Sequence, residues 1–324
     1  MCEFELIERF FRRPAGRAAL GIGDDCALLQ PTPGAQIAVS SDMLVLGRNF
    51  LPDVAPQTLG HKALAVNLSD LAACGARPLA FTLALALPNV DEAWLEAFSR
   101  GLFALADAHG CELIGGDTTR GPLNICITVF GEVPLIDGRS QALLRSGAKA
   151  GDDLYLSGRV GDARLALDML QGRCAMQTAV LDRARRRMEQ PTPRVALGIA
   201  LRGLASAAID VSDGLLGDLG HVLKASGMGA RVDTAWVMAS EATSADLKAA
   251  GLQQALPCAL SGGDDYELVF TAARAARQAV QAAALGSATP VTCIGRIEPE
   301  SGLRLVDGDG RPLANRYPSF DHFR

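Results

Sequence analysis

The stretch Leu113-Ile-Gly-Gly-Asp-Thr-Thr-Arg120 decides how this chain is interpreted. Cys111, Leu113 and Ile114 predict a short buried strand, and we expect the two glycines to end it. Glycines let the backbone approach a bulky anion and expose its N–H groups. The aspartate can hold a hard cation, and the arginine can meet phosphate oxygens. A lone Gly-Gly-Asp is also common turn chemistry, so this stretch by itself leaves a plain turn open.

Further acidic clusters with glycine, serine or asparagine lie elsewhere in the chain. They are mostly aspartates at the ends of apolar segments, where loop residues build sites. Several carboxylates in one place repel one another unless cations fill the cluster, and oxygen-only ligands select magnesium over zinc. The pattern predicts a shared metal–phosphate site that suits phosphoryl transfer. The clusters are Gly21-Ile-Gly-Asp-Asp25, Ser40-Ser-Asp42, Asn67-Leu-Ser-Asp70, Asp210-Val-Ser-Asp-Gly214 and Ser261-Gly-Gly-Asp-Asp265.

Length and charge limit the remaining possibilities. The chain has 324 residues, enough for two domains, and its 49% apolar and 21% charged residues suit a globular protein with a full core. The formal net charge of −5 argues against nucleic acid as a partner. The densest basic patch, Arg183-Ala-Arg-Arg-Arg187, is interpreted as a solvated helix face rather than a binding patch.

The cysteines and the N-terminus favour a soluble cytoplasmic protein. The chain has 8 cysteines, none in a Cys-x-x-Cys pair, as expected for reduced buried thiols. Glu3, Glu5 and Glu8 argue against a signal peptide. The longest apolar run, near Leu79–Leu87, is too short to span a bilayer, so we expect no membrane association.

The predicted elements place the first clusters near one another. Cys26–Leu29 and Gln36–Ser40 are expected to form a hairpin that brings Asp24, Asp25 and Asp42 together. A helix that begins near Pro56 and ends before Gly75 puts Asn67 and Asp70 on one face, which could point at that hairpin. Other predicted helices cover 3–12, 91–109, 162–170, 181–188, 195–205 and 215–225, and other predicted strands 81–87, 124–133, 143–147, 154–156, 207–211, 266–271, 291–297 and 303–306.

Several enzyme classes are excluded by missing motifs. The chain contains no Gly-x-x-x-x-Gly-Lys-[Ser/Thr], so it is not a P-loop enzyme. It contains neither His-Arg-Asp nor Asp-Phe-Gly, which excludes the protein-kinase fold, and no Gly-x-Ser-x-Gly with matching partners marks a hydrolase.

The motifs resemble the thiamine-monophosphate kinase family of the aminoimidazole-ribonucleotide-synthetase-like ATP-binding superfamily. The resemblance implies an α/β (α+β) fold with mixed sheets flanked by helices. It implies an ATP/Mg-binding and dimerisation domain over 1–147 and a C-terminal α/β domain over 148–324 that completes the active site. The segments that carry the resemblance are Gly21–Ala27, Lys62–Ala73, Leu113–Pro122, Arg145–Lys149, Ile209–Leu215 and Leu260–Leu268.

The resemblance also implies the reaction and its residues. A homodimer would transfer phosphate from ATP to thiamine monophosphate, giving thiamine diphosphate and ADP, with several Mg²⁺ ions. The implied magnesium ligands are Asp25, Ser40, Ser41, Asp42, Asp70, Asp117, Asp210 and Asp213. The implied ATP contacts are Gly116, Asp117, Arg145 and Ser212, and the implied catalytic residues are Asp117, Arg145 and Asp213. The implied substrate contacts are Asn49, Asp264 and Phe320.

Two residues depart from the family pattern. Asn49 stands where members carry His, and Asp264 stands where members often carry Glu, a longer side chain of the same charge. Direct in-line transfer without a phosphoenzyme is expected, because the aspartates are better explained as metal ligands than as nucleophiles. His61, His109, His221 and His322 lie outside the clusters.

Two other functions stay open. A sibling ATP-dependent synthetase of the same superfamily would use the same magnesium clusters with another acceptor. A non-enzymatic calcium-binding module would also be rich in aspartate, but it needs closely alternating ligands such as Asp-x-Asp-x-Asp-Gly, which the chain lacks.

Overall fold

A computed structural model describes residues 2–14, 16, 18–239 and 241–318. The described residues form two compact units. The first comprises Met1–Leu71 and Ala76–Gln141, and the second comprises Ala72–Gly75 and Ala142–Arg324. The division between the units, after Gln141, lies slightly before the boundary that was predicted at residue 147. Within the described ranges, no helix has the length and apolar character needed to cross a membrane.

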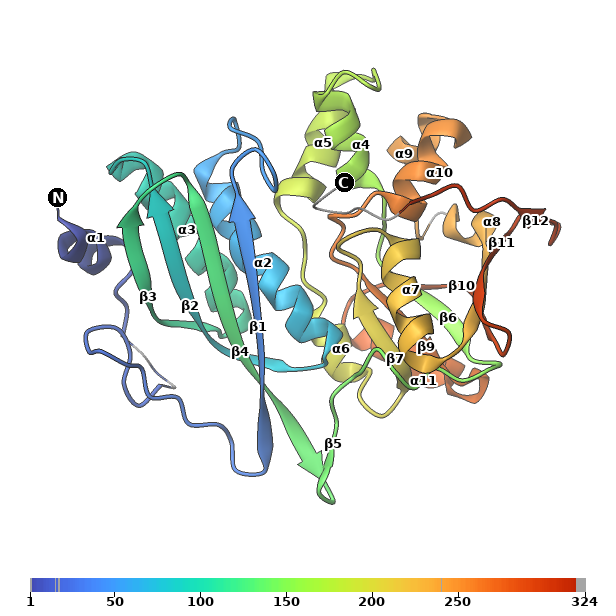
Figure 1. The fold of residues 1–324 in the computed structure, drawn as a ribbon, viewed down its shortest axis with the longest axis horizontal. Helices are drawn as coiled ribbons and strands as arrows, with labels where there is room; N and C mark the ends of the chain where they lie inside the picture. Colours follow the sequence, from blue (N-terminus) through green and yellow to red (C-terminus); the bar gives the residue numbers. More distant parts are fainter. Residues whose placement is uncertain (1, 15, 17, 240, 319–324) are drawn as a thin grey trace. The chain divides into compact units, whose positions relative to one another are not determined.

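The first unit is a mixed sheet with helices on one face. Its strands run in the order β1-β4-β2-β3, with β5 paired to β4, and only β2 and β3 are parallel neighbours. Helices α2 and α3 lie behind this sheet in Figure 1. The elements are α1 (Glu3–Phe10), β1 (Ala35–Val45), α2 (Pro56–Ala73), β2 (Arg77–Leu87), α3 (Glu92–His109), β3 (Glu112–Arg120), β4 (Asn124–Ile136) and β5 (Arg139–Ser140).

Local signals explain the helices of this unit. Proline stands at the first position of α2, where a missing N–H has no cost. Asp91 caps α3 by accepting a hydrogen bond from Trp94 N at 3.1 Å, and Gly110 ends α3 in the left-handed conformation with φ 57°. These helix boundaries agree with the prediction.

Two strand predictions were wrong. Cys26–Leu29 is not a strand, and β1 pairs along its whole length with β4 instead. Leu28 forms only an isolated bridge with Leu20, so residues 20–28 form a local loop. The longer strand β4 provides the backbone hydrogen bonds of β1. The two glycines of the opening stretch do not end a strand, because β3 continues through them to Arg120.

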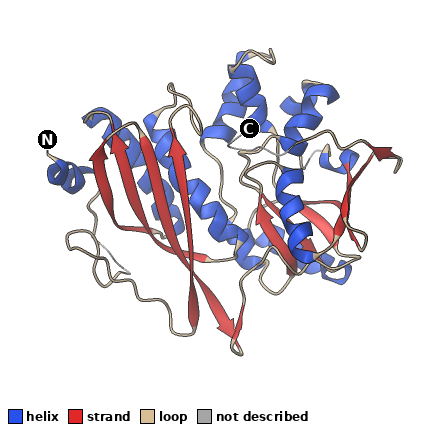
Figure 2. Ribbon diagram, in the orientation of Figure 1, coloured by secondary structure: helices blue, strands red, loops and turns tan. Residues whose placement is uncertain are grey.

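The second unit is built on a longer mixed sheet. Its strands run in the order β12-β11-β8-β10-β6-β9-β7, and β8 and β11 are parallel. Figure 2 shows the strands in red and the helices in blue. The predicted helix over 195–205 is shorter than expected, and 143–147 is not a strand. The elements are β6 (Asp153–Ser157), α4 (Asp162–Leu170), α5 (Thr178–Glu189), α6 (Val195–Ala200), β7 (Ala205–Asp210), α7 (Leu215–Ser226), β8 (Gly229–Asp233), α8 (Thr234–Val237), α9 (Ala245–Ala249), α10 (Leu252–Ser261), β9 (Leu268–Ala272), η1 (Arg274–Ala276), α11 (Arg277–Gly286), β10 (Val291–Glu298), β11 (Gly302–Val306) and β12 (Pro312–Leu313).

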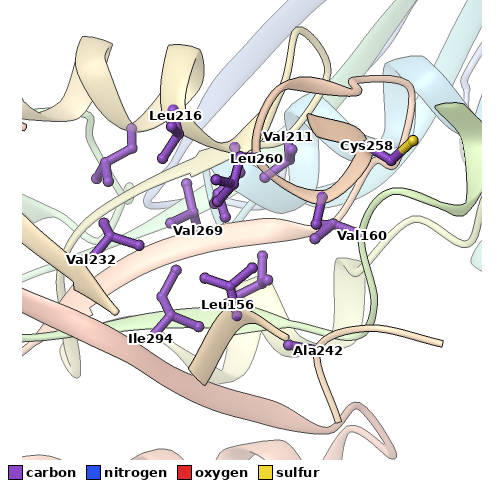
Figure 3. Close-up of a cluster of buried hydrophobic side chains, with 14 of the residues drawn as sticks. Leu156, Val160, Val211, Leu216, Val232, Ala242, Cys258, Leu260, Val269 and Ile294 are labelled. Atoms are coloured by element: carbon purple, nitrogen blue, oxygen red, sulfur yellow. The ribbon is translucent and has the colours of Figure 1, made fainter. Parts of the chain in front are cut away.

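The core of the second unit lies between its sheet and helices α7 and α10. Leu156 and Val269 project from central strands, Leu216 from α7 and Leu260 from α10 (Figure 3). These side chains are almost fully buried, and burial of a leucine or valine contributes about 1.5–3 kcal/mol. The packing positions the loops that carry Asp210–Gly214 and Ser261–Asp265.

A buried ion pair fixes α11 to the sheet. Asp153 on β6 is 1% exposed and accepts hydrogen bonds from Arg277 Nε at 2.5 Å and Nη2 at 2.9 Å. Burial alone would raise the pKa of Asp153, but the hydrogen bonds and charge of Arg277 outweigh burial and lower it. The ionised carboxylate therefore stabilises the fold above its ordinary pKa of 3.8, and this contribution is lost as the pH falls through the lowered value.

We expect Arg277→Gln to lower the free energy of unfolding by about 1–3 kcal/mol at pH 7, because Asp153 loses its bidentate partner. The difference from wild type should shrink below about pH 4, where Asp153 of the variant is protonated. Denaturant unfolding at several pH values measures both effects. Arg316→Gln, which removes a charge from an exposed position that is not among the groups acting on Asp153, serves as the control. An equal loss in the control, or a difference independent of pH, would contradict this account.

Candidate active site

The first acidic group of the first unit joins β1 to α2. Ser40 Oγ donates a hydrogen bond to Asp70 Oδ2, and Asp42 N donates to Asn67 Oδ1 at 3.0 Å. Ser40 and Asp42 are two residues apart on β1, so they share the face covered by α2. The polar face of α2 therefore lies against β1, the strand that carries Asp42, although the hairpin expected there does not form.

Ser41 lies on the opposite face of β1. Its Oγ lies 3.0 Å from Thr128 Oγ1 and donates to the Ile127 carbonyl at 3.1 Å. Alternation along the strand thus separates Ser41 from Ser40 and Asp42. The three residues are close in sequence, but Ser40 and Asp42 face α2, whereas Ser41 faces the opposite side of the sheet.

The second acidic group lines a cavity of about 680 Å³ beside β3. Asp24 and Asp25 meet Gly116 and Asp117 there, together with residues of α1. The expectation that Asp25 lies beside Asp42 was therefore wrong in this unit. Two strands separate β1 from β3, which puts the two acidic groups roughly 14 Å apart at strand spacing.

Gly116 adopts a positive φ where β3 packs closely against β2. Its φ is +147°, and a Cβ atom there would lie 1.9 Å from the Leu83 carbonyl of β2. A side chain at this position would break the β2–β3 pairing, so packing alone requires the glycine. The neighbouring Asp117 is exposed at the cavity.

Asn49 closes the turn after β1. Its Oδ1 accepts a hydrogen bond from Val45 N at 3.0 Å, and its own N–H donates to the Val45 carbonyl at 3.0 Å. The side-chain carbonyl is therefore engaged with the backbone, as in other turns built by asparagine.

In the second unit, two of the predicted clusters lie against each other. Asp264 N donates to the Ser212 carbonyl at 2.7 Å, and Tyr266 N donates to the Val211 carbonyl at 2.9 Å. Asp264 itself has a φ of 62°, a left-handed conformation that is uncommon outside glycine. Asp210, Ser212, Asp213 and Asp264 thus belong to one constellation at the end of β7 and the start of α7.

Asp218 anchors this constellation and was missed at the sequence level. It is 3% exposed, and its Oδ2 accepts hydrogen bonds from Ser212 N and Asp213 N, both at 3.0 Å. Burial raises the pKa of Asp218 to about 7. An aspartate in the first turn of a helix that follows an Asp-rich turn is the signal that could have identified it.

Arg145 lies in a segment that runs beside the edge strand β7. The Leu144 carbonyl accepts a hydrogen bond from Ala208 N at 2.9 Å. Ser226 Oγ accepts from Gly147 N at 3.2 Å and donates to the Arg145 carbonyl at 3.3 Å. Arg145 is exposed, and its guanidinium forms no ion pair with any residue in the described ranges.

Two buried acids follow Asp264. Asp265 accepts hydrogen bonds from Gly161 N at 2.9 and 3.0 Å, and burial raises its pKa well above the ordinary value. Glu267 is fully buried and accepts hydrogen bonds from Arg187 Nη2 at 2.9 Å and Arg194 Nε at 2.6 Å. These two acids hold the Gly-Gly-Asp-Asp loop in place, a structural role that the sequence did not reveal. Phe320 lies outside the described residues.

The donor set fits magnesium that is shared with phosphate. In the described part of the chain, no group of three His, Cys, Asp or Glu side chains is arranged so that it could hold a metal ion by itself. The predicted ligands are oxygen donors, which Mg²⁺ prefers. Magnesium in phosphate-transferring sites takes one or two carboxylates and completes its coordination with water and substrate oxygens. Small groups such as Asp42 with Asp70 match that requirement.

Known proteins resemble the chain over almost its whole length. Residues 23–133 match the family described as AIR synthase related protein, N-terminal domain, and residues 149–308 match AIR synthase related protein, C-terminal domain. Thiamine-monophosphate kinase of Escherichia coli (strain K12) is 48% identical over 326 residues, which cover 99% of this chain and 98% of that protein. The chain belongs to the thiamine-monophosphate kinase family.

Solved structures of this kinase family share the fold. The crystal structure of thiamine-monophosphate kinase from Stenotrophomonas maltophilia K279a matches with a TM-score of 0.83 and 46% identity over 96% of each chain. A structure of AaThiL complexed with AMPPCP and TMP matches with a TM-score of 0.77 and 26% identity, over 91% of this chain and 89% of that one. The predicted family, enzyme class and two-domain α/β fold are confirmed.

We expect Asp218→Ala to destabilise the kinase fold by roughly 2–4 kcal/mol, because the N–H groups of Ser212 and Asp213 lose their acceptor. Asp218→Asn keeps an acceptor oxygen and should remain close to wild type. Denaturant unfolding of both variants measures the difference. Equal stability of the two variants would show that the turn does not depend on this acceptor.

Proposed function

We propose that the chain transfers the γ-phosphoryl group of ATP directly to thiamine monophosphate, giving thiamine diphosphate and ADP, with several Mg²⁺ ions. The match to AaThiL carries the proposal, because that protein was solved with TMP and with AMPPCP, an ATP analogue, and 91% of this chain is covered. The identity of 48% to the Escherichia coli kinase supports the same substrates.

In the first unit, the proposed magnesium ligands come from two acidic groups. Ser40, Asp42 and Asp70 form one group at β1 and α2, and Asp25 and Asp117 form another at the β3 cavity. Ser41 is proposed as a further ligand from the open face of β1. Gly116 and Asp117 are proposed to meet ATP, since both line the cavity.

In the second unit, the proposed groups surround the turn after β7. Asp210 and Asp213 are proposed as magnesium ligands, and Ser212 and Arg145 as ATP contacts. Arg145 can neutralise developing charge, because its exposed guanidinium forms no ion pair with the residues that the structure describes. Asp264 is proposed to meet the aminopyrimidine and Phe320 the thiamine ring, with Asn49 as a further substrate contact through its amide nitrogen.

Magnesium, when bound, would neutralise phosphate charge and bring two anionic groups together. The side chains of this protein then hold and align the reactants, which is most of what phosphoryl transfer requires. The acceptor phosphate is already largely ionised at neutral pH, so no strong general base is needed. We propose Asp117, Arg145 and Asp213 as the catalytic residues for that alignment.

We further propose a cytoplasmic homodimer. Ile37, Val39 and Met43 alternate along β1, so they share one sheet face, and they are 39%, 58% and 54% exposed. An apolar row of this kind is typical of a surface that another chain covers. All eight cysteines are free thiols, which supports a reducing compartment.

The central test is an assay of thiamine diphosphate formation from thiamine monophosphate, ATP and MgCl₂. We expect turnover, and we expect excess chelator to abolish it and added magnesium to restore it. Turnover with an amine or formyl-bearing acceptor instead of thiamine monophosphate would favour a sibling synthetase. Full turnover in chelator would exclude the magnesium role.

We expect Asp70→Asn to lower kcat by at least about 100-fold, as other lost electrostatic stabilisers do. The amide can still accept the hydrogen bond from Ser40, so the thermal midpoint should change little. Asp137→Asn, at an exposed turn with φ 49°, is the matched control and should keep full activity. Near-normal turnover of Asp70→Asn would remove this residue from the metal site.

Direct transfer predicts inversion of configuration when the γ-phosphoryl group of ATP is chirally labelled. It also predicts sequential kinetics, because both substrates must be bound before transfer. Retention of configuration, or a stable labelled protein formed from ATP alone, would establish a phosphoenzyme instead.

A further inference from the structure

An arginine-lined cavity of about 510 Å³ lies within the second unit, beside helices α4 and α5. The two helices pack against each other (Figure 1). None of the described residues that are proposed to bind magnesium, ATP or thiamine monophosphate lines this cavity. In the described part of the chain, its arginines are Arg159, Arg183, Arg186, Arg187 and Arg194.

Three of these arginines are held in position by acids. Arg187 and Arg194 both donate to the buried carboxylate of Glu267, Arg194 through Nε at 2.6 Å. Arg183 makes two hydrogen bonds to Asp246, at 2.6 and 2.8 Å. A guanidinium that is already oriented loses less rotamer entropy when it binds a further anion through its remaining N–H groups.

The other two arginines have no such partner. Within the described ranges, neither Arg159 nor Arg186 forms a side-chain hydrogen bond or an ion pair, and both are exposed. Of the described residues that line the cavity, five are arginines and two, Asp162 and Asp246, are acids. Outside the lining, Arg187 also faces the buried Glu267 and Asp265, and Arg183 faces Asp182, so the excess of cations is confined to the cavity wall. Asp162 is itself engaged by Ser244 Oγ at 2.5 Å. Such an excess attracts small anions into a concave site.

We propose that this cavity binds a small anion that carries two or more phosphate groups, of the inorganic diphosphate class. Guanidinium forks match phosphate oxygens in geometry and charge, and the volume lies in the usual range for ligand pockets. Apart from the arginines and acids, the described residues that line the cavity are small and none is aromatic: Gly158, Ala184, Ser244 and Pro290. A base or other flat ring would find little to stack on, so the phosphate groups are the recognised part.

This inference revises the interpretation of Arg183–Arg187 as a solvated helix face. Arg185 points elsewhere and pairs with Glu189 at 2.5 Å, but Arg183, Arg186 and Arg187 all line the cavity. The site goes beyond the proposed kinase reaction, since it needs neither magnesium nor the aspartate clusters.

Calorimetric titration with inorganic diphosphate tests the proposal. The full-length protein is stripped of metal on a chelating resin and titrated in magnesium-free buffer, where the aspartate clusters repel anions. We expect one binding event per chain, weakened at least about tenfold in Arg159→Gln/Arg186→Gln. Arg274→Gln/Arg316→Gln removes the same charge from exposed positions outside the cavity and should bind as wild type does.

A second titration, with ADP in the same buffer, identifies which part of the ligand the cavity recognises. Equal affinity for ADP and diphosphate would mean that the terminal phosphates are sufficient, and binding of diphosphate alone would mean that the cavity takes the free anion. No binding to wild type, or equal weakening in both double variants, would overturn the proposal. Because exposed arginines are replaced, thermal midpoints should stay unchanged. Kinase activity is not part of the readout, so failure here leaves the proposed reaction untouched.

Discussion

The carboxylate of Glu267 has no contact with solvent, and burial of a charge costs several kcal/mol unless partners compensate. Ser157 donates to it at 2.7 Å, and Arg187 and Arg194 supply the positive charge. Its own backbone carbonyl accepts a hydrogen bond from Val211 N at 2.7 Å. One residue therefore joins β6, α5 and the start of α6 to the turn that carries the aspartates. The two arginines that compensate this buried charge also line the adjacent cavity.

Charge repulsion between carboxylates is a physical reason for the first unit to keep its acidic side chains in two separate groups. Asp42 and Asp70 are supported by Asn67 and Ser40, whereas Asp24, Asp25 and Asp117 lie at a separate cavity. Dividing the acids into small groups on a sheet limits their mutual repulsion before any cation arrives. Each group is then small enough to leave coordination positions for phosphate oxygens, which a closed cage of protein ligands would occupy.

Local signals in the sequence predicted most helices, and long-range pairing accounts for most errors. Gly110 and Pro56 mark helix ends by backbone chemistry that needs no tertiary information. The partner of β1, in contrast, lies far along the chain, and alternation alone does not say which apolar run will pair with it. The acidic clusters could be predicted because aspartates recur beside glycine, serine or asparagine at the ends of apolar segments, which is visible in sequence. Asp218 and Glu267 were missed because their importance comes from burial.

The position of β4 within its sheet has a consequence for synthesis of the chain. This strand is the last long one of the first unit, yet it lies between β1 and β2, and Ser41 contacts Thr128 across 87 residues. At roughly 5–20 residues per second on the ribosome, β1 waits roughly 4–17 seconds for its partner. During that interval its apolar alternating face and unpaired backbone are open to other nascent chains. Residues 35–45 therefore stay without a strand partner until β4 has been synthesised.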